Sequence, residues 1–393
     1  MAIEKFTADL IMPVTGPGLE NHVIVTNDSG TILSIDPADQ HDPVSVKQLK
    51  GVLTPGFVNT HCHLELSHMK GRVETGTGLL PFLSKVVSLR EVPMEEIMDA
   101  IAQADREMYD GGIVAVGDIS NKADTIPTKR NSSLRYYTFV EMFDFLQNER
   151  ADSTFEQYLQ VFEQHDDSNG NQKSCVPHAP YTVSPSLFGR IRKQNPENIT
   201  VSIHNQETPH ENDFFLSKGG AFADWYKGFG FDTSHFPATG KHSIHYAIQH
   251  LNPNSRTLFV HNTMSTPEDI AAAQQWSDKV YWATCANANL YIENRLPNYQ
   301  HFMEAEAKMT IGTDSLTSNW QLSILEEMKT IARYQSYISF ETLLRWATLN
   351  GAKALGYEKE LGSFEVGKQP GLVLLNLDNS LTLRPDTAAQ RII

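Results

Sequence analysis

The sequence is poor in residues and patterns that mark several large classes of protein. It has three cysteines among 393 residues, Cys62, Cys175 and Cys285, and their odd number and wide spacing argue against a disulfide framework or a thiolate zinc site. It contains no run of about 18 apolar residues that could cross a bilayer. The opening residues, MAIEKFTADLIMPV, lack the segments of a signal peptide. We therefore expect a soluble protein of the reducing cytoplasm.

Positive charge is also scarce. The 32 lysine and arginine residues are outnumbered by 47 aspartate and glutamate residues, which gives a formal net charge of -15, and no dense basic run offsets it. Such a surface repels polyanions, so we expect neither nucleic acid nor an anionic membrane as a partner. The length and the 40% hydrophobic content suit two domains or one large α/β barrel with an accessory unit.

Short β-branched or aromatic runs alternate with helix-length segments along most of the chain. Amphipathic spacing predicts helices such as Met94–Tyr109, Thr266–Trp276 and Ile324–Tyr337. Parallel strands need such crossovers, so eight runs favour a closed (β/α)8 barrel, with an open doubly wound sheet as the alternative. The eight runs are Val52–His63, Val114–Ser120, Arg135–Phe143, Ser174–Val183, Thr200–Glu207, Thr257–Thr263, Lys279–Cys285 and Met309–Ser315.

The two ends of the chain have a different pattern. Residues 1–51 are typical of short strands, with turn signals at Asn27-Asp28 and Ser29-Gly30, and Gly362–Leu377 is typical of a strand, a turn and a second strand. We expect the two ends to form a small β unit beside the barrel.

The most informative local motif is the pair of histidines in Val58-Asn59-Thr60-His61-Cys62-His63, at the end of an apolar run. Side chains two residues apart on a strand point the same way, so His61 and His63 can face one metal ion while Cys62 faces the other side.

Three further chemical groups stand at the ends of other predicted strands. His204 closes TVSIH, His261 closes TLFVH and Asp314 closes MTIGTD. In a parallel barrel these ends open on one face, where active sites are found. A single strand-end histidine is more often a structural residue. Burying so many titratable groups together is costly without a metal or substrate, which favours a functional site for the set.

Glu207 follows three residues after His204, in His-Asn-Gln-Glu. A carboxylate just beyond a ligand strand could exchange protons with an activated water without coordinating the metal. The alternative is a solvated loop glutamate.

Several segments together resemble the amidohydrolase superfamily, in its branch of cyclic-amidine and nucleobase deaminases that also includes triazine chlorohydrolases. The resemblance implies a distorted (β/α)8 barrel over residues 52–361, and a β-sandwich built from residues 1–51 and 362–393. The segments are PGFVNTHCHLE at 55–65, HAPYTVS at 178–184, HNQE at 204–207, VHNT at 260–263, GTDS at 312–315 and GSFEVGKQPGLVLL at 362–375.

The resemblance also implies a role for each matching residue. Glu207 matches the family's proton shuttle, and His261 matches a histidine that orients the attacking water or the substrate. His178 matches a histidine that contacts substrate, and Asp314 takes part in catalysis as well as in metal binding. The implied metal ligands are His61, His63, His204 and Asp314.

Two departures from the family pattern bear on the metal and on the substrate. The run Ser174–Val183 contains no lysine, so the carboxylated lysine that bridges two metals has no candidate there, and we expect one metal ion. Residues 285–290, Cys-Ala-Asn-Ala-Asn-Leu, depart from the Cys-Pro-x-Ser-Asn form of many deaminases. The family's substrates are therefore a weaker guide to the substrate of this protein. Three imidazoles and a carboxylate suit Zn²⁺ best and leave Fe²⁺ open.

We expect a metal-dependent deaminase that releases ammonia from an amino-substituted N-heterocycle or its nucleoside, such as an aminopurine, an aminopyrimidine or an aminofutalosine-like compound. The alternatives are a hydrolase with another leaving group, acting on a chlorotriazine, a guanidine or imine, or a cyclic amide, and a barrel scaffold without activity. Segments 64–93 and 208–245 are expected to supply the pocket and a lid. A homodimer remains open, because relatives are often dimers.

Overall fold

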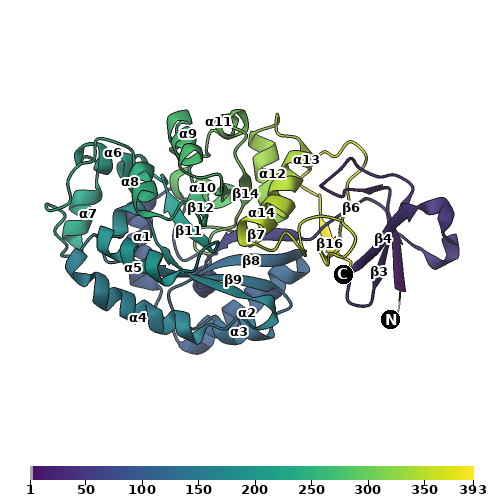
Figure 1. The fold of residues 1–393 in the computed structure, drawn as a ribbon, viewed down its shortest axis with the longest axis horizontal. Coiled ribbons are helices and arrows are strands. Elements are labelled where there is room, and N and C mark those ends of the chain that lie inside the picture. Colours follow the sequence, from purple (N-terminus) through teal and green to yellow (C-terminus); the bar gives the residue numbers. More distant parts are fainter. Residues whose placement is uncertain (1–2) are drawn as a thin grey trace.

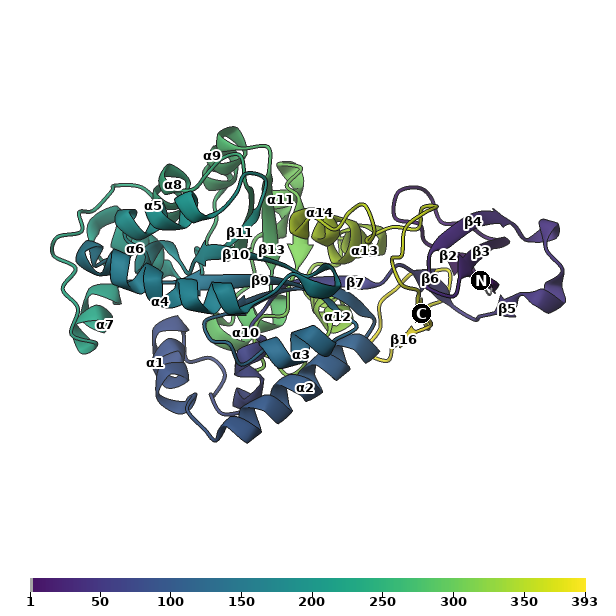
Figure 2. The same ribbon diagram turned by 60° about the horizontal axis from the view of Figure 1, so that its bottom comes forward.

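The computed structural model describes residues 3–393. A large barrel with helices around it occupies most of the molecule, and two small sheets lie beside it (Figure 1). The first and the last strand of the described chain belong to these small sheets, as the view in Figure 2 also shows. Within residues 3–393, no helix combines the length and apolar character needed to cross a membrane.

Eight parallel strands form the barrel, in the orders β7-β8-β9-β10 and β11-β12-β13-β14. The two halves meet on both sides: the amide of His204 donates to the carbonyl of His178 at 2.9 Å, and Cys62 pairs with Asp314 in a parallel bridge. The barrel is therefore closed, and each predicted run overlaps one of its strands. The strands are β7 (Phe57–Cys62), β8 (Ile113–Ser120), β9 (Arg135–Met142), β10 (Gln172–Pro177), β11 (Thr200–Asn205), β12 (Arg256–His261), β13 (Val280–Thr284) and β14 (Met309–Ile311).

Helices follow most of these strands and pack their apolar faces against the barrel. The predicted helices at 94–109 and 266–276 are confirmed, and Thr266 and Asp269 cap the second of them reciprocally. The third ends at Tyr334 and not at Tyr337, because Gln335 leaves the helical conformation. The helices are α1 (Leu79–Leu89), α2 (Met94–Asp110), α3 (Ile126–Asn131), α4 (Ala151–Gln164), α5 (Pro185–Gln194), α6 (Pro209–Ser217), α7 (Phe222–Gly228), α8 (Ser243–His250), α9 (Pro267–Trp276), α10 (Ala286–Glu293), α11 (Tyr299–Glu304), α12 (Ile324–Tyr334), α13 (Phe340–Arg345) and α14 (Gly351–Leu355).

The chain ends form two four-stranded sheets, β4-β3-β1-β5 and β16-β15-β6-β2. They have a small apolar core that is separate from the barrel core. The expected turn after Asn27 is confirmed, because its side chain accepts bonds from the amides of Ser29 and Thr31. The expected strand, turn and strand within 362–377 is wrong: only β15 forms there, and its partner β16 follows later. The strands are β1 (Ile3–Thr7), β2 (Leu10–Ile11), β3 (His22–Asn27), β4 (Ile32–Pro37), β5 (Lys47–Gln48), β6 (Val52–Thr54), β15 (Val373–Leu375) and β16 (Ala389–Arg391).

The division into residues 1–51 plus 362–393 and residues 52–361 stays a prediction. The terminal sheets do include β6, which joins them through β2 and β15.

One irregularity in the barrel lies next to the first histidine pair. Asn59 pairs with Val116 and Cys62 pairs with Asp118, so β7 has one residue more than β8 between these two pairs. This bulge brings the carbonyl of Thr60 so close to Gly117 that a Cβ atom at position 117 would lie 2.5 Å from the carbonyl oxygen. Glycine is therefore needed at position 117 for the strand to follow this path.

We predict that Gly117→Ala lowers the free energy of unfolding by about 1–3 kcal/mol, because the added methyl group has no room and the strands must shift. Gly189→Ala is the matched control: Gly189 lies within α5 with no atom within 4 Å of its added Cβ, so this change should stabilise by about 0.5–1 kcal/mol. Denaturant unfolding of both variants measures the difference. Equal stabilities would show that the bulge tolerates a side chain.

Candidate functional site

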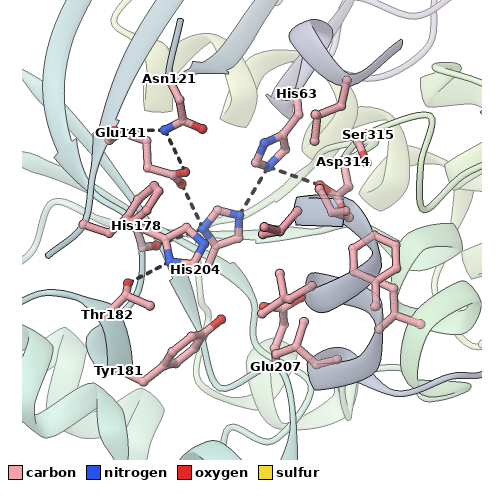
Figure 3. Close-up of a pocket in the computed structure, with 18 of the residues that line it drawn as sticks. His63, Asn121, Glu141, His178, Tyr181, Thr182, His204, Glu207, Asp314 and Ser315 are labelled. Atoms are coloured by element: carbon pink, nitrogen blue, oxygen red, sulfur yellow. Dashed lines mark hydrogen bonds and ion pairs between the residues drawn. The ribbon is translucent and has the colours of Figure 1, made fainter. Parts of the chain in front are cut away.

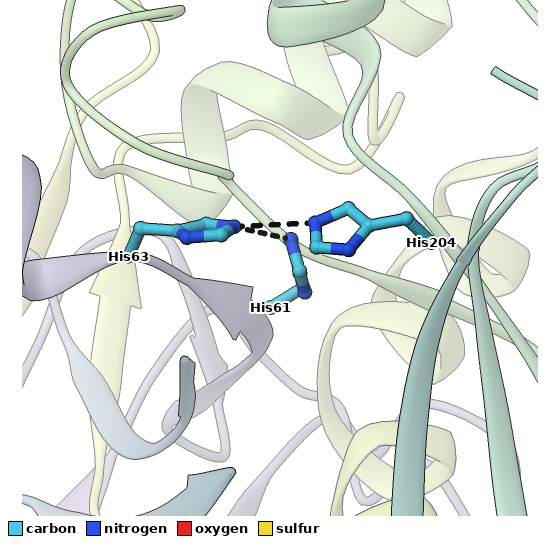
Figure 4. A group of neighbouring side chains, drawn as sticks. All are labelled: His61, His63 and His204. Atoms are coloured by element: carbon cyan, nitrogen blue, oxygen red, sulfur yellow. Dashed lines mark hydrogen bonds between the residues drawn. The ribbon is translucent and has the colours of Figure 1, made fainter. Parts of the chain in front are cut away.

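Three imidazoles meet at the carboxyl ends of β7 and β11. The Nε2 atom of His63 lies 3.1 Å from Nε2 of His61 and 3.3 Å from Nε2 of His204, and all three rings point at one another (Figure 4). Oδ1 of Asp314 lies 3.3 Å from Nε2 of His63 and 3.6 Å from Nε2 of His61. The structure thus brings together the four residues that the sequence analysis assigned to one metal.

These separations fit a metal ion. Ligands about 2.0–2.1 Å from a tetrahedral ion lie roughly 3.3–3.4 Å from one another, close to the separations between the Nε2 atoms seen here. Facing nitrogen lone pairs repel unless a cation or a proton lies between them. The Nε2 atoms of His61, His63 and His204 could therefore hold a divalent ion. Oδ1 of Asp314, within 3.6 Å of two of these atoms, is available as a fourth donor.

The protonation of most of these groups also suits a metal. Burial lowers the pKa of His61 and of His63 to about 4, so both rings are neutral at pH 7. Burial alone would raise the pKa of Asp314, but the neighbouring imidazoles hold it well below its usual range. Burial also disfavours a charge on His204, yet the hydrogen bond and the charge of Glu141 raise its pKa to about 9. An ion would have to displace that proton.

Glu207 and His261 lie beside the cluster and close to each other. Oε1 of Glu207 is 3.4 Å from Nε2 of His261, and Nδ1 of His261 lies 2.8 Å from Oδ1 of Asn289. Because the Asn289 oxygen accepts the Nδ1 proton, Nε2 of a neutral His261 can only accept. Burial raises the pKa of Glu207 to about 8 and lowers that of His261 to about 4. A protonated Glu207 is therefore compatible with its neighbour at neutral pH.

The backbone at the strand ends is strained at functional positions. His261 has φ = 73° and Asp314 has φ = 58°, and Gln206, next to Glu207, has φ = 49°. Such left-handed conformations cost energy for non-glycine residues and cluster at functional sites. The amides of Thr313 and Asp314 both bond to the carbonyl of His61, which holds the turn at the end of β14 in place.

A cavity opens at the cluster, and Figure 3 shows His63, His178, His204, Glu207 and Asp314 in its lining. His261 lines the same cavity. His178 is a neighbour of His204 here, and its Nδ1 lies 2.8 Å from the hydroxyl of Thr182. Its predicted substrate contact is untested, but its position on the cavity wall is compatible with it.

The expected pocket segments contribute unequally. Segment 64–93 supplies Leu66 and most of one face of α1, whereas segment 208–245 supplies only Trp225 to the lining. The aromatic side chains of Phe214, Phe215 and Tyr226 are buried and pack on one another instead. Packing of inserted helices thus accounts for most of the aromatic content of that segment.

The sequence analysis missed Glu141, which lines the cavity at the end of β9. Its carboxylate lies 3.3 Å from Nδ1 of His204 and accepts a bond from Asn121. The strand-end argument could have found it, because it stands two residues before the end of the predicted run 135–143. It also missed Asn289, which lies inside the segment set aside as a departure from the family, and Ser318, whose hydroxyl donates to Oδ2 of Asp314.

A buried ion pair lies behind the histidine pair. Lys129 of α3 is 3% exposed and Asp118 of β8 is fully buried; the ammonium lies 2.6 Å from Oδ2 of Asp118 and also donates to the hydroxyls of Ser120 and Thr138. Oδ1 of Asp118 accepts the amide of Leu64 at 2.8 Å, the first amide after His63. This bond fixes the chain at the point where β7 turns away from the strand direction.

The fourth barrel strand has one lysine, and it lies away from the cluster. Strand β10 starts two residues before the predicted run and includes Lys173, but this residue is at the amino end of the strand. Its ammonium donates to the carbonyls of Phe162 and His165, at the opposite end of the barrel from the cluster. It cannot bridge two metals in this conformation.

A closed eight-stranded barrel with three histidines and an aspartate at its strand ends is the arrangement of metal-dependent hydrolases. The chain belongs to the amidohydrolase family, whose model matches residues 52–391. It is 29% identical over 395 residues to a 5-methylthioadenosine/S-adenosylhomocysteine deaminase of Bacillus cytotoxicus, covering 93% of this chain and 83% of that protein.

Two solved structures have the same fold. Aminofutalosine deaminase of Helicobacter pylori, in complex with methylthio-coformycin, superposes with a TM-score of 0.81 at 22% identity, covering 96% of this chain and 93% of that one. An adenosine deaminase of Xanthomonas campestris with bound zinc has a TM-score of 0.75 at 24% identity, covering 97% of this chain and 86% of that one.

We predict that the bond from Asp118 to the Leu64 amide supports metal affinity more than stability. The double variant Asp118→Leu/Lys129→Met removes the acceptor and the buried charges together, and zinc should bind about 10- to 100-fold more weakly. The control Asp118→Asn/Lys129→Met keeps an oxygen for the Leu64 amide and should bind zinc as the wild type does. Competition with a chromophoric chelator measures both, and equal affinities in the two double variants would contradict the prediction.

Proposed function

We propose that this chain is a metal-dependent deaminase that hydrolyses the exocyclic amine of an aminopurine nucleoside or a related amino-N-heterocycle and releases ammonia. The observation that carries the proposal is the placement of a buried Glu207, with its raised pKa, beside a cluster that could hold a metal, within one cavity. The relatives named above support the leaving group, since each is a deaminase by name.

The proposed ion is a single Zn²⁺, held by His61, His63, His204 and Asp314. When bound, it would lower the pKa of a water molecule toward neutrality and supply the nucleophile for attack on the ring carbon that bears the amine. The zinc in the Xanthomonas structure supports this choice of metal, and the same donors suit Fe²⁺.

The side chains of the cavity then have distinct tasks. Asp314 is ionised at neutral pH, so its carboxylate can accept the proton of the attacking water. Glu207 carries a proton at neutral pH and delivers it to the ring nitrogen beside the reacting carbon. The departing amine takes the proton that Asp314 accepted from the water and leaves as ammonia, and the remaining hydroxyl proton returns to Glu207.

His261 stabilises the tetrahedral centre and holds the Glu207 carboxyl in position. Its ring orientation is fixed by Asn289, so its Nε2 atom faces Glu207 and the reaction centre rather than solvent. His178 is proposed to contact the substrate ring from the opposite wall, next to Thr182. These assignments give a role to each of seven titratable groups in a small buried volume.

We predict that Glu207→Gln lowers kcat for ammonia release by about 100- to 10,000-fold, because the amide cannot protonate the ring nitrogen of the substrate. Glu207 is outside the proposed ligand set, so zinc content should stay at one ion per chain. A coupled ammonia assay on an aminopurine nucleoside panel, with elemental analysis of both proteins, tests this. Wild-type turnover by a zinc-loaded variant would refute the role of Glu207.

Zinc binding should release a proton from His204. At pH 7 the ring is protonated in the metal-free protein, since its pKa is raised to about 9, and coordination at Nε2 requires that proton to leave. The affinity should therefore rise about tenfold for each pH unit up to about pH 9. In Glu141→Gln the anionic partner is lost, burial lowers the His204 pKa, and one proton fewer is released.

Calorimetric titration with zinc in two buffers of different ionisation enthalpy counts these protons. The wild type and Glu141→Gln are compared at pH 7, so any proton released by other groups cancels in the difference. Equal proton release would show that Glu141 does not hold His204 in its charged form.

A further inference from the structure

One face of α1 forms a wall of the cavity. The positions that line it are 79, 82, 83, 86 and 87, followed by 90 just past the helix, which are the spacings of one helical stripe. The first five of these are apolar: Leu79, Phe82, Leu83, Val86 and Val87. Val87 is 56% exposed although its side chain lines the cavity, so an apolar surface faces the space above the cluster.

Further apolar side chains from other elements line the cavity as well. Phe143 and Phe145 follow β9, Ile292 lies on α10 and Trp225 lies on α7, and all of them line the same cavity. The indole of Trp225 donates to the hydroxyl of Ser84 at 3.1 Å, which ties α7 to α1. The outer part of the cavity is therefore an apolar chamber, continuous with the polar floor formed by the histidines, Glu207 and Asp314.

Among the described residues that line the cavity, Arg90 is the one lysine or arginine. Its charge is already paired with that of a carboxylate. Its guanidinium donates to Oε1 of Glu65 at 3.2 Å. The amides of Asn121 and Lys122 donate to the other carboxylate oxygen of Glu65, which fixes the carboxyl group from behind. A phosphate or a zwitterionic group in the chamber would contact apolar side chains and the Arg90 guanidinium, whose charge is already balanced by Glu65.

We propose that the substrate has an apolar group, such as a thioether, alkyl or aryl group, on the side of the molecule away from the reacting amine, and that the α1 stripe binds it. This inference rests on the proposed function, because the cluster and Glu207 place the reacting amine at the cavity floor. Covering the stripe with an apolar substituent removes its surface from water, which a hydroxyl or a charged group cannot do without losing its own hydration.

The test compares nucleosides that share one base and differ only in the group at the far end. With zinc-loaded enzyme, kcat/KM for 5′-methylthioadenosine should exceed that for adenosine by about 10- to 100-fold, as expected for burying a thiomethyl group in place of a hydroxyl. Adenosine 5′-phosphate should be a poorer substrate than adenosine. Equal or greater kcat/KM for adenosine or its phosphate overturns the inference.

Variants on the same helix provide the matched control. Leu83→Ser and Val87→Ser each remove one apolar side chain from the α1 stripe. The double variant should have nearly equal kcat/KM for 5′-methylthioadenosine and for adenosine. Leu89→Ser changes a residue that is 41% exposed and outside the cavity lining, so it should keep the wild-type preference. Val87→Ser alone, at an exposed position that is expected to leave folding intact, should give a partial loss. An unchanged ratio in the double variant overturns the role of α1.

Failure of the proposed function is separable from failure of this inference. If no nucleoside releases ammonia, the deaminase proposal is overturned, and the same comparison is made on dissociation constants from calorimetry with zinc-loaded protein. Tighter binding of 5′-methylthioadenosine than of adenosine, lost in the double variant and kept in Leu89→Ser, supports the apolar chamber. Equal dissociation constants refute it.

Discussion

The constraint on which the site depends is the burial of several titratable groups within a few ångströms of one another. Neutral His61 and His63, a protonated Glu207 and an ionised Asp314 share this space because burial disfavours charge on the first three, whereas the surrounding imidazoles keep Asp314 ionised. The histidine Nε2 atoms lie at the separations of ligands around one ion. Without a cation the cluster is a costly arrangement, so the structure around it must hold these groups together.

That support comes from backbone features at the strand ends. The bulge in β7 needs Gly117 opposite the Thr60 carbonyl, and Asp118 of the same strand holds the amide that follows His63. Left-handed backbone conformations at His261 and Asp314 turn the chain toward the cluster at the ends of β12 and β14. Replacing the buried Asp118 and Lys129 pair by apolar residues need not destabilise a protein. Its position next to His63 therefore favours a role in geometry over a role in stability.

Much of the fold and of the candidate site could be predicted from the sequence, because it follows from periodicity. Alternation on a strand placed His61 and His63 on one side, and eight runs in a parallel order placed His204, His261 and Asp314 at the same mouth. Features that depend on contacts between distant segments were not predictable. No periodic pattern in the sequence indicates the hydrogen bond between Asn289 and His261, the pairing of Arg90 with Glu65 or the left-handed turns. Strand β16 was missed because its partner β15 lies across a long loop.

The apolar walls of the cavity connect the chemistry of the floor with the choice of substrate. Burial is the largest cause of the raised pKa of Glu207, and the side chains of α1, Phe143 and Trp225 contribute to the cavity that excludes water from it. A substituent that covers these walls would exclude water further and keep Glu207 protonated until its proton passes to the ring nitrogen. A charged substituent would bring water with it and lower that pKa. The same surface can therefore select the substrate and keep the proton carrier protonated, because both effects follow from the low polarity of the chamber.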